Sequence, residues 1–85
     1  MTSWRTMILE EIFYTEGPDA KLAACTLTDE QMDEEFDPGY GRERGAPFTA
    51  WTERRVYFPV CYDGSEWVGS APRHPCDEAT YHQGR

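Results

Sequence analysis

The sequence has 85 residues, with 16 Asp and Glu against 8 Lys and Arg, so the net charge at pH 7 is −8. Nucleic acids and anionic membranes repel a chain of this charge, which argues against direct binding to either. The length suits a single domain over residues 1–85, and it is short for an enzyme, which needs a pocket as well as a scaffold.

Cysteine usage and the N-terminal segment both favour a cytoplasmic protein. Cys25, Cys61 and Cys76 are an odd, scattered set, which does not suit a disulfide framework and does suit a reducing compartment. Glu10 and Glu11 interrupt the apolar residues near the N-terminus, so this segment does not have the pattern of a signal peptide. No stretch approaches the ~18 apolar residues of a membrane-spanning helix.

Aromatic residues, at 14% of the chain, indicate that it folds despite its charge. Aliphatic residues are scarce, which by itself is typical of disorder. Each aromatic side chain buries roughly 150–250 Å², however, and disordered chains are poor in aromatics. We therefore expect a small core built mainly from rings.

The first predicted element is a helix over residues 3–14, with Ser3 or Thr2 as the N-cap and Gly17-Pro18 as the stop. Residues 21–27 form a short apolar run that fits a strand or a helix equally well. The helix is predicted because apolar side chains recur at helical spacing, namely Trp4, Met7, Ile8, Ile12 and Phe13.

A second, short helix is predicted from Thr28 to about Phe36. Thr28 and Gln31 have the spacing of a capping box, in which the N-cap and N3 side chains satisfy each other's backbone N–H groups. Asp37-Pro38-Gly39 is expected to end this helix, because the residue before a proline disfavours helical geometry.

The second half of the chain predicts an antiparallel meander of three strands, at residues 48–52, 55–62 and 65–71. Asp63-Gly64 is typical of a two-residue type I′ turn, which sets Val60 opposite Trp67 and Phe58 opposite Gly69. The fold class is therefore α+β, with one or two helices on this sheet and an irregular tail from about residue 73. The predicted core face of the hairpin comprises Val56, Phe58, Val60, Trp67 and Ala71.

The densest charge lies between Asp29 and Asp37, where six of nine residues are acidic. Like charges one turn apart destabilise a helix by a few tenths of a kcal/mol per pair. The segment therefore has a negative surface at the cost of a less stable helix. A solvated face that aids solubility explains such a run about as well as a surface for a basic partner does. On a helix, five of the carboxylates share one side: Asp29, Glu30, Asp33, Glu34 and Asp37.

The histidines, cysteines and arginines do not form a pattern that indicates a site. We predict no cofactor, no bound metal and no catalytic residue. His74, Cys76 and His82 with Asp77 and Glu78 are of ligand types that zinc accepts, but their spacing matches no standard zinc motif. The cysteines lack an orienting His and acid at a recognisable spacing. The arginines Arg42, Arg44, Arg54 and Arg55 are expected to balance the acidic helix or flank loops.

The run from Phe48 to His82, FTAWTERRVYFPVCYDGSEWVGSAPRHPCDEATYH, resembles short accessory proteins of bacteriophages and mobile elements. In size, charge and α+β make-up the chain is similar to small anti-CRISPR proteins, with those that act on type I Cascade complexes as one candidate group. The resemblance implies action by occupancy in the bacterial cytosol, in some cases by mimicry of nucleic-acid charge. It carries no catalytic residue over to this chain.

The leading hypothesis is a non-enzymatic inhibitor that presents the acidic segment to a basic, nucleic-acid-binding protein such as a CRISPR effector subunit. The partner-binding residues would be the five carboxylates of the second helix, with Glu10 and Glu11 extending the field. One alternative is an interaction module that uses exposed aromatics, Trp51, Tyr57 and Trp67, and another is a small metal-binding protein.

Overall fold

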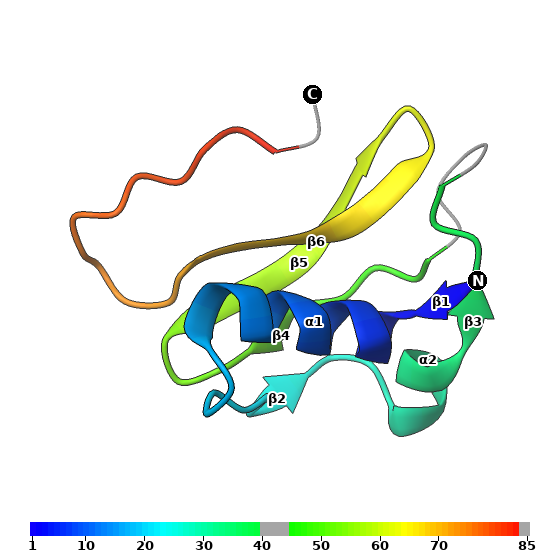
Figure 1. The fold of residues 1–85 in the computed structure, drawn as a ribbon, viewed down its shortest axis with the longest axis horizontal. Helices are drawn as coiled ribbons and strands as arrows, with labels where there is room; N and C mark the ends of the chain where they lie inside the picture. Colours follow the sequence, from blue (N-terminus) through cyan, green and yellow to red (C-terminus); the bar gives the residue numbers. More distant parts are fainter. Residues whose placement is uncertain (40–44, 84–85) are drawn as a thin grey trace.

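The chain adopts an α+β fold with antiparallel strands, as predicted, in a computed structural model that describes residues 1–39 and 45–83 (Figure 1). In this part of the chain, β1 pairs with β3, and the larger sheet has the strand order β2-β4-β5-β6. The elements in order are β1 (Thr2–Ser3), α1 (Trp4–Glu16), β2 (Ala24–Cys25), α2 (Asp29–Asp33), β3 (Glu35–Phe36), β4 (Ala50–Trp51), β5 (Arg55–Tyr62) and β6 (Ser65–Pro72).

The larger sheet contains β2 in addition to the three predicted strands, so the three-stranded meander is wrong in this detail. β2 lies in the run 21–27, which fitted strand and helix equally well, and it pairs antiparallel with β4. Backbone hydrogen bonds extend this pairing, from Ala23 N to the Trp51 oxygen at 2.7 Å and from Thr26 N to the Thr49 oxygen at 2.9 Å. Partners distant in sequence therefore determine that this run is extended.

The β5–β6 hairpin has the predicted turn and register. Both turn residues have positive φ, 52° at Asp63 and 83° at Gly64, as a type I′ turn requires. Tyr62 pairs with Ser65, and the register continues along both strands to Arg55 opposite Pro72. The pairing of Val60 with Trp67 and of Phe58 with Gly69 is confirmed.

The face of the hairpin that meets the core is opposite to the predicted one. Tyr57 is fully buried and Val68 is 5% exposed, and both join the core cluster beneath α1. On the predicted face, Val60 is buried outside that cluster, and Trp67 is 36% exposed. The alternation of aliphatic residues suggested the wrong side because α1 also supplies polar partners that allow a tyrosine to be buried.

Helix α1 begins at the predicted cap and packs on the hairpin (Figure 1). The Ser3 side chain accepts a hydrogen bond from the Thr6 N–H, and Gly17 ends the helix with a φ of 96°, a conformation that favours glycine. Its buried residues are Trp4, Ile8 and Ile12. Phe13, predicted on the apolar stripe, is instead 62% exposed.

Trp4 is the centre of the aromatic core. Its ring lies 4.9 Å from the Phe36 ring and 4.8 Å from the Phe48 ring, both tilted, and its indole Nε1 donates to the Ala46 carbonyl oxygen at 2.9 Å. Gly45 packs so closely that a Cβ atom there would lie 2.5 Å from the indole ring. The expectation of a core built from rings is correct for this end of the molecule.

Helix α2 is shorter than predicted. The Thr28 and Gln31 capping box is present, but the helix ends at Asp33 and the backbone is extended at Glu34. The next two residues form β3, which pairs with β1, and Phe36 is thereby buried against Trp4. Burial of the Phe36 ring and the pairing of β3 with β1 stabilise the fold more than a further helical turn of the acidic run would have done.

Candidate functional site

The shortened helix rearranges the predicted acidic face. Asp29, Glu30 and Asp33 lie within the single helical turn of α2, whereas Glu34 and Asp37 lie beyond it. The five carboxylates therefore do not form one row at helical spacing, and that part of the prediction is wrong. The negative charge still gathers in one segment, but without the regular helical spacing that was predicted.

Arg5, on the first turn of α1, binds two of the predicted carboxylates. Its Nε donates to Asp33 Oδ1 at 2.5 Å and its Nη2 to Asp29 Oδ1 at 3.0 Å. These hydrogen bonds, to Asp33 first and then Asp29, raise the pKa of the guanidinium above its ordinary value. Asp29 and Asp33 thus hold α2 to α1, and they present less free charge to a partner than expected.

The remaining carboxylates of this segment point to solvent. The Asp37 carboxylate accepts the Gly39 N–H at 3.1 Å, which shapes the turn after β3. Among the described residues, these six acidic groups have one guanidinium bound to them, that of Arg5. We call this the α2 acidic surface; its exposed acids besides Asp29 and Asp33 are Glu30, Glu34, Glu35 and Asp37.

Glu10 and Glu11, expected to extend this field, lie elsewhere. Both line a groove beside β6 together with Trp67 and Val68, and no α2 residue contributes to that groove. Glu11 is half-buried, and this burial raises the pKa of its carboxyl group, while the charge of Arg55 acts in the opposite direction. The structure therefore separates the predicted set into two regions rather than one continuous patch.

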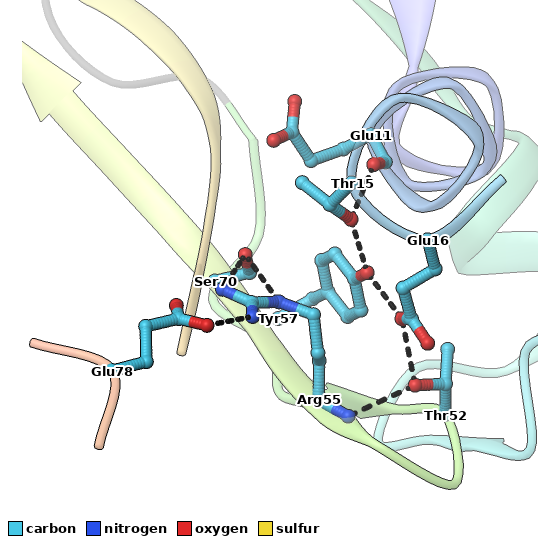
Figure 2. Close-up of polar contacts among 8 residues, drawn as sticks. All are labelled: Glu11, Thr15, Glu16, Thr52, Arg55, Tyr57, Ser70 and Glu78. Carbon is cyan, nitrogen blue, oxygen red and sulfur yellow. Dashed lines mark hydrogen bonds and ion pairs between the residues drawn. The ribbon is translucent and has the colours of Figure 1, made fainter. Parts of the chain in front are cut away.

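A polar network beneath α1, centred on Tyr57, was not found from the sequence (Figure 2). The Tyr57 hydroxyl lies 2.5 Å from Glu16 Oε2, to which it donates, and 2.6 Å from Thr15 Oγ1. Thr52 donates to the same Glu16 oxygen at 2.8 Å. Burial first, and then the Glu16 hydrogen bond, raises the pKa of the phenol well above its ordinary value, so Tyr57 stays protonated and acts as a donor.

This network joins the helix to the sheet. Thr15 and Glu16 come from the last turn of α1, Tyr57 from the first half of β5, and Thr52 from the turn between β4 and β5. The same Thr52 hydroxyl accepts the backbone N–H groups of Arg54 and Arg55. Each group is satisfied, and a neutral phenol beside a carboxylate is a stabilising arrangement rather than a nucleophilic one.

The predicted aromatic binding residues are not all exposed. Tyr57 is fully buried and Trp51 is half-buried, so the first was wrongly assigned to the surface. Trp67 is 36% exposed, which agrees with the alternative of an aromatic interaction module and not with its predicted place on the core face. The structure adds Leu9 and Phe13 of α1, which lie beside Trp67 and which helical periodicity had assigned in part to the core.

Among the predicted basic and metal-binding residues, the clearest role belongs to Arg55. Its guanidinium donates to Ser70 Oγ from Nε and Nη2 and to Glu78 Oε1 from Nη1 at 3.0 Å, which ties the tail to β6 (Figure 2). Arg42 and Arg44 lie outside the described residues. His74, Cys76, Asp77 and His82 lie within them, and across residues 1–39 and 45–83 no three His, Cys, Asp or Glu side chains gather to hold a metal ion.

No family model, no curated protein and no solved structure matches this chain. In the described part of the chain, no helix is long and apolar enough to cross a membrane. Cys25, Cys61 and Cys76 are all free thiols.

Proposed function

We propose that the protein is a non-enzymatic inhibitor that acts in the bacterial cytosol by occupying a basic, nucleic-acid-contacting surface of a partner protein. The observation that carries this proposal is the α2 acidic surface, where Glu30, Glu34, Glu35 and Asp37 remain exposed beside the Arg5-bound pair. A net charge of −8 adds long-range attraction to the same partner, so association is fast at low salt.

The mode of action is charge competition rather than a close copy of a nucleic-acid strand. A helix of one turn with extended chain after it presents carboxylates in a compact group, not at the repeating interval of phosphates. A basic groove that releases counterions on binding DNA responds to such a group in the same way. The resemblance to anti-CRISPR proteins makes a CRISPR effector, and a type I Cascade complex in particular, the first partner to test.

The test compares two variants of equal net charge in a duplex-DNA binding assay with the purified effector complex. The first reverses three acids of the α2 acidic surface to lysine: Glu30, Glu34 and Glu35. The second reverses three exposed acids elsewhere: Asp19, Glu53 and Asp77. The first variant is expected to lose inhibition, whereas the second retains most of it.

Salt dependence provides the second readout. Inhibition by the wild-type protein is expected to weaken as the salt concentration rises, because exposed charges are screened within a Debye length of about 8 Å at physiological ionic strength. Equal inhibition by the two charge-reversal variants, or inhibition that salt does not change, would contradict the proposal.

A further inference from the structure

The outer edge of β6 has backbone groups that the sheet does not use. The two-residue turn makes Tyr62 and Ser65 a hydrogen-bonded pair, so the bonded pairs alternate along the hairpin and include Trp67 and Gly69 of β6. The N–H and C=O groups of Val68 and Ser70 must therefore point away from β5.

Two contacts support this assignment of the backbone groups. The Glu66 N–H, two residues before Val68, donates outward to the Pro38 carbonyl oxygen and not to β5. On the partner strand, Pro59 lies opposite Val68, where a residue without an N–H costs no bond to β6. In the part of the chain that the structure describes, β6 has β5 as its strand neighbour and ends the sheet.

This edge forms the floor of a groove between α1 and the C-terminal tail, which we call the β6 groove. On one side lie Leu9, Glu10, Glu11 and Phe13 of α1, next to Trp67 and Val68. On the other side, residues of the tail between 78 and 83 line a space of about 630 Å³ together with residues 67–70 of β6.

The walls of the β6 groove combine exposed apolar side chains with a carboxylate. Leu9 is 46%, Phe13 62% and Trp67 36% exposed, so apolar surface is left open beside an unpaired strand edge. Proteins normally cover or charge such an edge, and clusters of exposed apolar side chains mark binding sites. Glu11 adds a half-buried carboxylate that makes no hydrogen bond or ion pair within residues 1–39 and 45–83.

We infer that the β6 groove binds an extended peptide segment of a partner protein, which adds to the sheet as a further strand beside β6. Strand addition uses the main chain for affinity and alternate side chains for specificity. Peptide side chains in this groove would meet the carboxylates of Glu10 and Glu11 and the apolar surface of Trp67, so the groove favours a peptide that combines basic and apolar residues. This groove is separate from the α2 acidic surface, and the inference stands independently of the proposed function.

The experiment titrates the full chain, labelled with nitrogen-15, with the capped hexapeptide Lys-Val-Lys-Val-Lys-Val and follows amide hydrogen exchange. The expected result is new protection of the Val68 and Ser70 amides, whereas the Trp67 and Gly69 amides, already bonded to β5, do not change. The peptide Lys-Pro-Lys-Pro-Lys-Pro keeps the charge but cannot pair as a strand, and it is expected to give no protection.

Two substitutions test whether the peptide binds in the β6 groove. Glu11→Gln is expected to weaken binding of the Lys-Val peptide roughly fivefold, since it removes one partly exposed ion pair. The control Glu30→Gln, on the α2 acidic surface, is expected to leave it unchanged. Loss of binding in Glu30→Gln but not in Glu11→Gln would overturn the inference and leave the proposed function intact.

Two further outcomes would also overturn the inference that the β6 groove binds an extended peptide. One is binding of the Lys-Val peptide without protection of Val68 and Ser70. The other is protection of these amides in the absence of peptide that increases with protein concentration, which would assign the edge to a second copy of this chain.

Discussion

The Tyr57 hydroxyl donates a hydrogen bond to the Glu16 carboxylate across 2.5 Å and thereby joins the first half of β5 to the last turn of α1. Because Tyr57 is fully buried, this bond forms where water cannot replace it. The bond explains how the polar end of a tyrosine is accommodated in a core that also contains Ile8 and Ile12.

Substitution of Tyr57 by phenylalanine should lower the free energy of unfolding by about 1–2 kcal/mol. The change keeps the ring in the core but removes the donor to a charged acceptor, and such bonds are worth more than neutral ones. The measurement is urea denaturation at neutral pH. Tyr62→Phe, on the same strand but 55% exposed, is the matched control, and equal midpoints for the two variants would refute the role assigned to Tyr57.

The raised pKa of Tyr57 should be visible in an alkaline titration. In the unfolded chain the phenol ionises near its ordinary pKa of about 10, while in the folded protein it stays protonated above that pH. Its contribution to stability is therefore present below pH ~10 and is lost as the pH rises toward the folded value.

Tyrosinate absorbance provides the measurement for this titration. Between pH ~9 and ~11, while the protein stays folded, wild type and Tyr57→Phe should show the same increase. A reduced amplitude in Tyr57→Phe would mean that the buried phenol ionises normally.

Gly45→Ala should destabilise the aromatic core by about 1–3 kcal/mol, the usual cost of overpacking. A Cβ atom at this position would lie 2.5 Å from the Trp4 ring, which is itself held by Phe36, Phe48 and the Ala46 carbonyl. Thermal or urea unfolding measures the effect. In Gly39→Ala the nearest atom to the new Cβ is 3.9 Å away, so that variant should unfold like wild type.

Glu78→Gln should loosen the C-terminal tail. The Arg55 guanidinium binds Glu78 at 3.0 Å and lowers the pKa of this carboxyl group, so the ion pair stabilises the tail above the ordinary pKa of glutamate. That stabilisation is lost as the pH falls through the lowered value. Trypsin cleavage after Arg73 should become roughly two- to fivefold faster at neutral pH, as expected for one exposed ion pair.

The neighbouring variant Asp77→Asn serves as its control, because it removes a carboxylate of similar exposure beside the pair. Cleavage at the wild-type rate in Glu78→Gln, or equal acceleration in both variants, would show that the pair with Arg55 does not hold the tail.

Local patterns in the sequence predicted those features whose causes are local. Ser3 caps α1, Thr28 and Gln31 form their capping box, and Asp63-Gly64 forms the turn that sets the hairpin register. Each depends on hydrogen bonds or backbone angles within a few residues, and these operate before any tertiary contact forms.

Fewer features of the candidate site could be predicted from local patterns in the sequence. The acidic segment was correctly located, but helical spacing could not reveal that β3 ends the helix or that Arg5 binds Asp29 and Asp33. Arg5 is the one basic residue between positions 4 and 16, which is the signal that would have suggested such a role. Its partners, more than twenty residues away, are brought to it by the packing of α2 on α1.

The sequence by itself therefore determined the charge, the α+β class, the caps and the hairpin register, because these follow from composition and short-range geometry. The tertiary structure decided which face of the hairpin is buried, where α2 ends and which carboxylates remain exposed. The physical reason is that each of these depends on a partner from another element: Glu16 for Tyr57, Trp4 for Phe36 and Arg5 for Asp33. The predicted set of carboxylates is thus divided between two surfaces, with Glu10 and Glu11 at the β6 groove and the others at the α2 acidic surface.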